Sequence, residues 1–140
     1  MPEATLANQL SLSAPSLEGA FFPATYFFLL GDSDTSILER AARKMEKELL
    51  HAWDTRAPNL LLKDPYEALI MASIIQKEAM LESEMPRISG VFHNRLRLKM
   101  RLQTDPTVIF GLGPDFKGPL KRSHLKKDTP YNTYTRGGLC

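Results

Sequence analysis

The sequence has few of the features that would place it in a specialised class of protein. Only one of its 140 residues is a cysteine, Cys140, so the chain cannot form an internal disulfide. No apolar run is long enough to span a membrane, and the nearest approach, residues 21–30, is interrupted by Pro23. The first residues have no basic stretch, so no signal peptide is expected. These absences leave an ordinary globular chain, long enough for one domain with a hydrophobic core.

The sequence also lacks a strong charge of either sign. Its 18 Lys and Arg against 16 Asp and Glu give a net charge of +2, whereas nucleic-acid-binding domains usually carry a stronger basic bias. Basic residues alternate with apolar ones over residues 95–102, and we prefer a solvated strand or helix end to a nucleic-acid site there. The three histidines are scattered without metal-ligand spacing. Neither nucleic acid nor a metal or other cofactor is therefore expected.

Three segments are predicted to be helices. Apolar residues recur at spacings of three and four over residues 35–53, where Ser36 and Glu39 could form a capping box. Residues 65–82 follow a stronger start signal, because Asp64 is a good N-cap and is followed by proline. A third helix is predicted over residues 86–98 from its single apolar face.

Two short strands are predicted outside these helices, one before the first helix and one after the third, so the fold class is expected to be α+β and rich in helix. Residues 23–29 contain aromatic residues and threonine, with a proline tolerated near the start of a strand. Residues 100–104 continue the alternating pattern described above. A short helix in an exposed loop is expected within residues 117–127. Residues 1–16 are small and polar and are expected to be a poorly ordered lead-in.

One carboxyl stands out on the predicted helix 65–82. Glu78 shares a stripe with Met71, Ile74 and Ile75, at helical offsets of seven, four and three. An apolar surrounding favours the protonated carboxyl, which is the form that a general acid needs. Alternatively, Glu78 lies past the buried part of the helix and reaches solvent, and periodicity alone favours this second interpretation.

The sequence offers no clear second catalytic carboxylate. Glycoside cleavage usually uses two carboxyl groups, and Glu82, Glu84 and Asp105 are available, but none has diagnostic spacing. A lytic mechanism needs only one carboxyl, because a hydroxyl of the sugar itself attacks. The same group can then act first as acid and afterwards as base.

Five blocks of sequence resemble, in the same order, blocks of the MltG/YceG-like endolytic murein transglycosylase family. They are residues 17–26, 71–79, 90–96, 100–111 and 129–135. The resemblance implies that residues 17–140 are part of a YceG-like catalytic domain, truncated at its C-terminus and without the family's membrane helix and LysM-like region. Many relatives have Glu where this chain has Gln76. Since an amide cannot serve as acid or base, the resemblance gives the catalytic role to Glu78.

The resemblance also implies a reaction and a place in the cell. Such enzymes cut the bond between MurNAc and GlcNAc in nascent glycan strands and leave 1,6-anhydro-MurNAc ends. The implied partners are peptidoglycan strands and the cell-wall synthesis machinery, at the periplasmic face of the inner membrane in the cell envelope. The alternative is a truncated fragment that binds glycan without cleaving it.

Seven further polar residues lie in the matching blocks and could bind sugar hydroxyl and acetamido groups: Asn94, Gln103, Thr104, Asp105, Tyr131, Asn132 and Tyr134. A structural explanation is equally open. In it, Gln103 to Pro106 form a capped turn, and Asn94 and Arg95 tie loops together.

Overall fold

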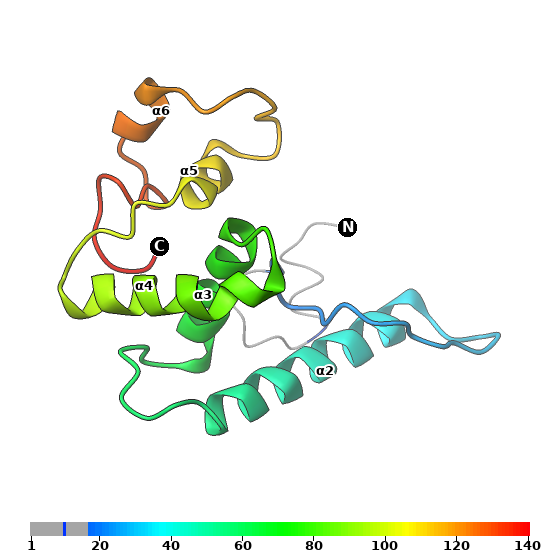
Figure 1. Cartoon of the computed structure of the whole chain (residues 1–140). Helices are drawn as coiled ribbons and strands as arrows, with labels where there is room; N and C mark the ends of the chain where they lie inside the picture. Colours follow the sequence, from blue (N-terminus) through cyan, green and yellow to red (C-terminus); the bar gives the residue numbers. More distant parts are fainter. Residues whose placement is uncertain (1–9, 11–16) are drawn as a thin grey trace. The chain divides into compact units, whose positions relative to one another are not determined.

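The computed structural model describes residue 10 and residues 17–140, and it divides the chain into a first unit, residues 1–56, and a second unit, residues 57–140. The predicted lead-in at 1–16 lies, apart from residue 10, outside the described residues. The helices are α2 (Asp34–Asp54), α3 (Pro65–Glu78), the 3-10 helix η1 (Glu82–Glu84), α4 (Met85–Arg97), α5 (Asp105–Leu112) and α6 (Arg122–Lys126) (Figure 1).

Helix α2 dominates the described part of the first unit and confirms the helix predicted at 35–53. Its cap differs from the prediction. Ser33, not Ser36, is the N-cap, and its Oγ accepts a hydrogen bond of 3.1 Å from the Ser36 amide. The Glu39 side chain accepts from Arg43 instead of closing a capping box. A serine three residues earlier, in the Gly-Asp-Ser turn, therefore determines where the helix begins.

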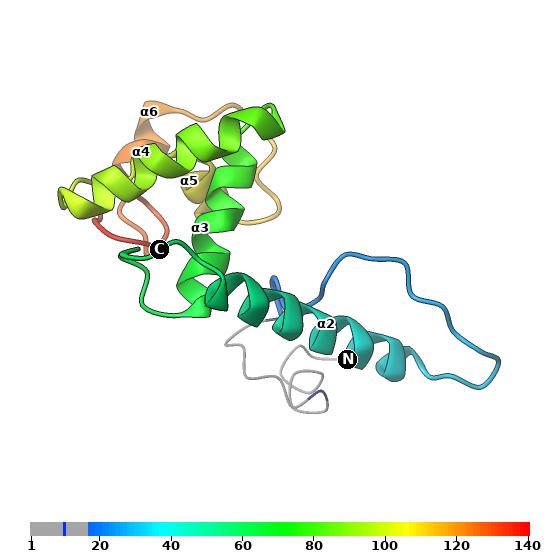
Figure 2. The ribbon, with the colours of Figure 1, turned by 60° about the horizontal axis from the view of Figure 1, so that its bottom comes forward.

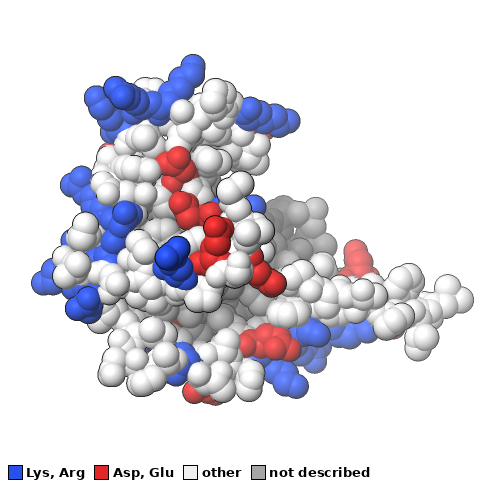
Figure 3. Space-filling view, viewed as in Figure 1, with Lys and Arg blue, Asp and Glu red and all other residues white. Residues whose placement is uncertain are grey.

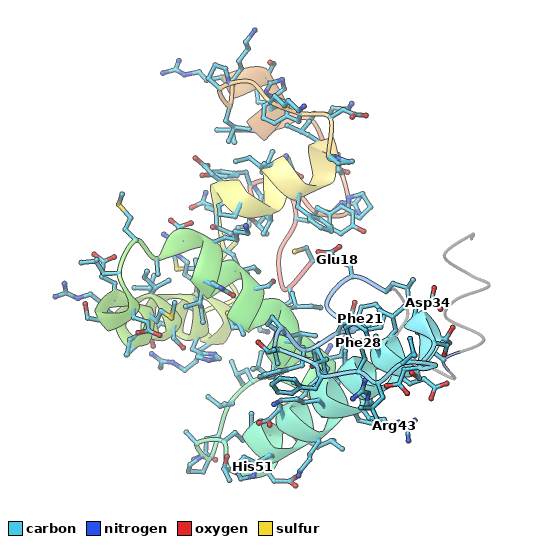
Figure 4. All side chains as sticks on the ribbon, turned by 90° about the vertical axis from the view of Figure 1, so that its right-hand side faces the viewer. Glu18, Phe21, Phe28, Asp34, Arg43 and His51 are labelled. Carbon is cyan, nitrogen blue, oxygen red and sulfur yellow. The ribbon has the colours of Figure 1, made fainter. Side chains whose placement is uncertain are left out.

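The strand predicted at 23–29 is absent, as the described residues contain no strand. A strand needs a neighbour to pair its backbone groups, and here side chains pair two of these groups. Arg40 of α2 donates to the Phe27 carbonyl at 2.6 Å, and the Leu29 amide donates to Asp32 at 2.9 Å. Figure 4 shows the segment bearing Phe21 and Phe28 running alongside α2. The apolar residues at its far end, from Phe27 to Leu30, are exposed.

Helix α3 begins where the sequence predicted. The Glu67 amide donates to Asp64 Oδ1 at 2.8 Å, and the Glu67 carboxylate accepts from the Lys63 amide at 2.7 Å. The helix ends at Glu78, earlier than the predicted 82, because Ala79 is extended with ψ 129°. Glu84 accepts from the Met80 and Leu81 amides and so closes the short turn that follows.

Helix α4 confirms the prediction at 86–98 and crosses α3 (Figures 1 and 2). The buried core of the second unit lies at this crossing and contains Met71, Ile74, Phe92 and Leu102. Helix α6 likewise confirms the short helix expected within 117–127. Among the described helices, none is both long and apolar enough to cross a membrane.

The strand predicted at 100–104 is also absent. Lys99 and Gln103 have φ of 55° and 52°, in the left-handed region, which interrupts an extended run. The basic side chains here bond within the protein: Arg95 donates to the Leu102 carbonyl, and Arg101 donates to the Tyr134 carbonyl at 2.9 Å. The alternating pattern thus reflects a looped connection held by arginines.

Helix α5 was not predicted, although its boundaries carry standard signals. Thr104 is the N-cap, Pro106 lies in the first turn, and Gly113 ends the helix with φ 90°. A capped turn at residues 103–106 is one of the two alternatives given above for the start of this segment, and neither alternative includes a helix. The helix has eight residues and is largely apolar, so it shows no periodicity that would distinguish it from a short buried run.

Candidate active site

Glu78 is the last residue of α3, and its side chain is exposed. Met71 and Ile74 of the same stripe are buried and Ile75 is half-buried, so the stripe passes into solvent at Glu78. The second interpretation of the periodicity is therefore the one observed. The carboxylate is nevertheless held, because its Oε2 accepts a hydrogen bond of 2.7 Å from the hydroxyl of Thr104.

Thr104 belongs to a buried group of three threonines, Thr104, Thr107 and Thr133, which we call the threonine cluster. The Thr104 amide donates to Thr133 Oγ1 at 3.0 Å, and Thr107 Oγ1 donates to the Thr104 carbonyl at 3.0 Å. The Thr107 and Thr133 hydroxyls are 2.9 Å apart. The cluster joins the start of α5 to the segment near residue 133, and so brings two of the sequence blocks together.

Next to Thr104, Asp105 is paired with Tyr134. The phenol donates to Asp105 Oδ1 at 2.6 Å. Burial, this hydrogen bond and the negative charges of Asp105 and Glu78 together raise the pKa of Tyr134 to about 12, while Arg95 acts in the opposite direction. The phenol is therefore a neutral hydrogen-bond donor across the physiological range, and Glu78, Asp105 and Arg95 all lie within its electrostatic reach.

The other predicted residues differ in how far solvent reaches them. Asn132 is 1 % exposed, and its Nδ2 donates to the carbonyls of Leu125 and Lys127 at 3.0 and 2.7 Å. Asn94 is exposed and accepts from Arg97, and Gln103 is exposed. Tyr131 is also exposed and packs edge-on against Phe110, with ring centroids 5.0 Å apart.

Two threonines of the site were not among the predicted residues. Thr107 and Thr133 lie inside the matching blocks, but a buried threonine gives no signal of its own in a single sequence. The two blocks together contain five threonines, and the sequence does not indicate which of them are buried. The contact between them depends on the folded chain and could not be predicted from spacing.

Acidic side chains gather on one face of the second unit, over the end of α3 and the start of α5 (Figure 3). The exposed acidic residues of these elements and of η1 are Glu78 at the end of α3, Glu82 and Glu84 in η1, and Asp105 at the start of α5. A negative surface of this kind stabilises positive charge, such as the charge that develops on a sugar ring when its glycosidic bond breaks. Across the described part of the chain, no three His, Cys, Asp or Glu side chains are grouped so that they could hold a metal ion.

The YceG-like family matches residues 2–140 of this chain. The endolytic murein transglycosylase of Bacillus subtilis (strain 168) is 41% identical over 125 residues, which cover 88% of this chain and 34% of that protein. The endolytic murein transglycosylase of Streptococcus pneumoniae (serotype 2, strain D39) is 31% identical over 128 residues, 88% of this chain and 23% of that protein.

Among solved structures, the crystal structure of a yceG-like protein from Listeria monocytogenes aligns with a TM-score of 0.74 and 32% identity. The alignment covers 97% of this chain and 47% of that one. The chain thus spans about a third or less of the two curated relatives, and about half of the crystallised one.

Proposed function

Since this chain belongs to the YceG-like family, we propose that it forms part of an endolytic murein transglycosylase and carries the catalytic acid/base, Glu78. The relatives that are 41% and 31% identical bear the name endolytic murein transglycosylase. The observation that carries the proposal is the position of Glu78. It is a solvent-accessible carboxyl held through one oxygen, and its Oε1 has no hydrogen-bond partner within the described part of the chain.

The proposed reaction needs only this one carboxyl. Protonated Glu78 gives its proton to the glycosidic oxygen as the bond from MurNAc C1 to GlcNAc breaks. The carboxylate that remains then takes the proton of the MurNAc 6-hydroxyl as that oxygen bonds to C1. The product is a 1,6-anhydro end, the carboxyl is protonated again, and no water is consumed.

We propose that accessible polar residues of the matching sequence blocks bind the sugar. Tyr134 and Asp105 form a fixed donor–acceptor pair, and Gln103, Tyr131 and Asn94 present exposed polar groups. The acidic face would stabilise the positive charge that develops at C1. Asn132 is buried with its donors occupied by carbonyls, so its proposed part is to hold the loop that carries Tyr134 and Tyr131.

The substrate in this proposal is the peptidoglycan glycan strand, and the place of action is the cell envelope. A position at the periplasmic face of the inner membrane, and contact with the cell-wall synthesis machinery, belong to the same proposal and rest on the family alone.

The test is a digest of purified peptidoglycan by the 140-residue chain, carried out in water enriched in the heavy oxygen isotope. Mass spectrometry should find 1,6-anhydro ends that contain no heavy oxygen, because water takes no part. Heavy oxygen in new reducing ends would indicate a hydrolase instead. Sedimentation with peptidoglycan but no new ends would indicate a glycan-binding fragment and would contradict the proposal.

A further inference from the structure

Thr104 occupies a helix N-cap but does not cap the helix. A threonine in this position usually accepts a hydrogen bond from a backbone amide two or three residues later. The side chain of Thr104 makes no such bond to α5. Its hydroxyl instead donates to Glu78 Oε2 at 2.7 Å, across 26 residues of sequence. A local stabilising interaction is thus given up for a contact with the proposed acid/base.

The backbone of Thr104 is fixed on both sides, so the direction of its hydroxyl is defined. The residue is 2 % exposed, its amide donates to Thr133, and its carbonyl accepts from Thr107. The preceding residue, Gln103, has φ 52°, and its amide donates to the Thr133 carbonyl at 3.1 Å. A non-glycine residue in this region of φ is strained and persists only where the surroundings impose it.

Glu78, in contrast, has little support from its own helix. It is the exposed last residue of α3, and Ala79 already leaves the helix. The C-terminal end of a helix carries partial negative charge, which is unfavourable for a carboxylate. A long side chain in such a place would adopt several rotamers. The Thr104 hydroxyl is its hydrogen-bond partner within the described part of the chain.

We propose that Thr104 is the positioning residue for Glu78. This inference rests on the proposed function of Glu78. A hydroxyl can donate to a carboxylate and can also accept from a carboxylic acid. Thr104 can therefore hold Glu78 in both protonation states of the reaction, while it neither gains nor loses a proton itself.

Two substitutions at Thr104 in the 140-residue chain test this directly. Thr104→Val removes the hydroxyl and keeps the shape, and we expect kcat for anhydro-end formation to fall about 10- to 100-fold, with KM within about twofold. Thr104→Ser keeps the hydroxyl and should recover most of the lost rate. A purely structural role would lower stability without this division between kcat and KM.

Thr107→Val is the matched control for loss of a buried hydroxyl. Thr107 belongs to the same cluster but makes no hydrogen bond to Glu78. The melting temperature of Thr107→Val should fall about as much as that of Thr104→Val, while the kcat of Thr107→Val falls several-fold less. Equal losses of kcat in the two variants would overturn the positioning role, because the rate would then follow stability alone.

A second set of variants separates the two proposals. If Thr104 acts through Glu78, adding Thr104→Val to Glu78→Gln should cause no further loss of rate. An active Glu78→Gln variant would overturn the proposed function, and this inference with it. An inactive Glu78→Gln variant beside a fully active Thr104→Val variant would overturn only the role of Thr104.

Discussion

The two units of the chain are built in different ways. The second unit buries large side chains of α3 and α4 around Leu102 and adds buried, hydrogen-bonded polar residues beside them. Apart from Leu10, the described part of the first unit buries only small side chains, those of Ala20, Ala41 and Ala42, while Phe27 and Phe28 are exposed. Both the stable core and the proposed chemistry therefore belong to the second unit. Every proposed site residue lies in the second unit, on a framework with its own core, and the first unit has no comparable interior among its described residues.

Among substitutions that test this contrast between the units, Leu102→Ala should have the largest effect on the free energy of unfolding. Leu102 is 0 % exposed in the core of the second unit, so truncation should lower the free energy of unfolding by about 2–5 kcal/mol. Leu98→Ala is the control, because Leu98 is 60 % exposed. Urea unfolding followed by circular dichroism measures both. Equal losses would show that the second unit is not organised around this core.

Asn132→Ala should have the second-largest effect on the free energy of unfolding. The side chain donates to the Leu125 and Lys127 carbonyls and accepts from the Tyr134 amide at 2.8 Å. Removing it leaves buried backbone groups without partners, at a cost of about 1–3 kcal/mol. Asn94→Ala, at an exposed position, should change the unfolding free energy by less than about 0.5 kcal/mol. The framework interpretation of Asn132 fails if the two variants unfold alike.

Asp64→Ala should have a smaller effect, confined to the start of α3. It removes the cap that accepts from the Glu67 amide, which typically costs about 1 kcal/mol. Asp64→Asn keeps a capping oxygen and should unfold nearly like the parent. Thermal melts of the three proteins give the comparison, and an equally destabilised Asn variant would mean that charge, not capping, matters here.

The smallest effect on stability is expected in the first unit. Phe28 is 69 % exposed, so Phe28→Ser should change the free energy of unfolding by less than about 0.5 kcal/mol. It should also reduce self-association at high concentration, because it removes apolar surface. Urea melts and sedimentation velocity measure the two quantities. A loss above about 1 kcal/mol would break the contrast between the units, since it would make Phe28 part of a core.

The parts of the fold that were predictable are those with local causes. Asp64 and Pro65 start α3 by capping and backbone preference, and the apolar spacings of α2 and α4 are visible in a single sequence. The two predicted strands were wrong because a strand depends on a partner elsewhere in the chain. Where none exists among the described residues, arginines and Thr133 satisfy the backbone groups instead.

The site residues likewise divide into those that the sequence indicates and those whose contacts depend on the folded chain. Glu78 could be selected from its place on an apolar helix and from the resemblance of its block to the family. Its contact with Thr104 could not, because the two residues are 26 apart in sequence and meet only when α5 lies beside the end of α3. Thr107 and Thr133 were missed for this reason as well. A buried hydroxyl has no sequence pattern, and its role follows from the partner that folding brings to it.

The most direct test of the central claim is the rate of anhydro-end formation by Glu78→Gln. Glutamine has nearly the same shape and can still accept from Thr104, so the fold and glycan binding should survive. Without a titratable proton the rate should fall by about 10²–10⁴ or more, while Glu82→Gln and Glu84→Gln change it only mildly. An active Glu78→Gln protein, with activity lost in either neighbour, would contradict the account.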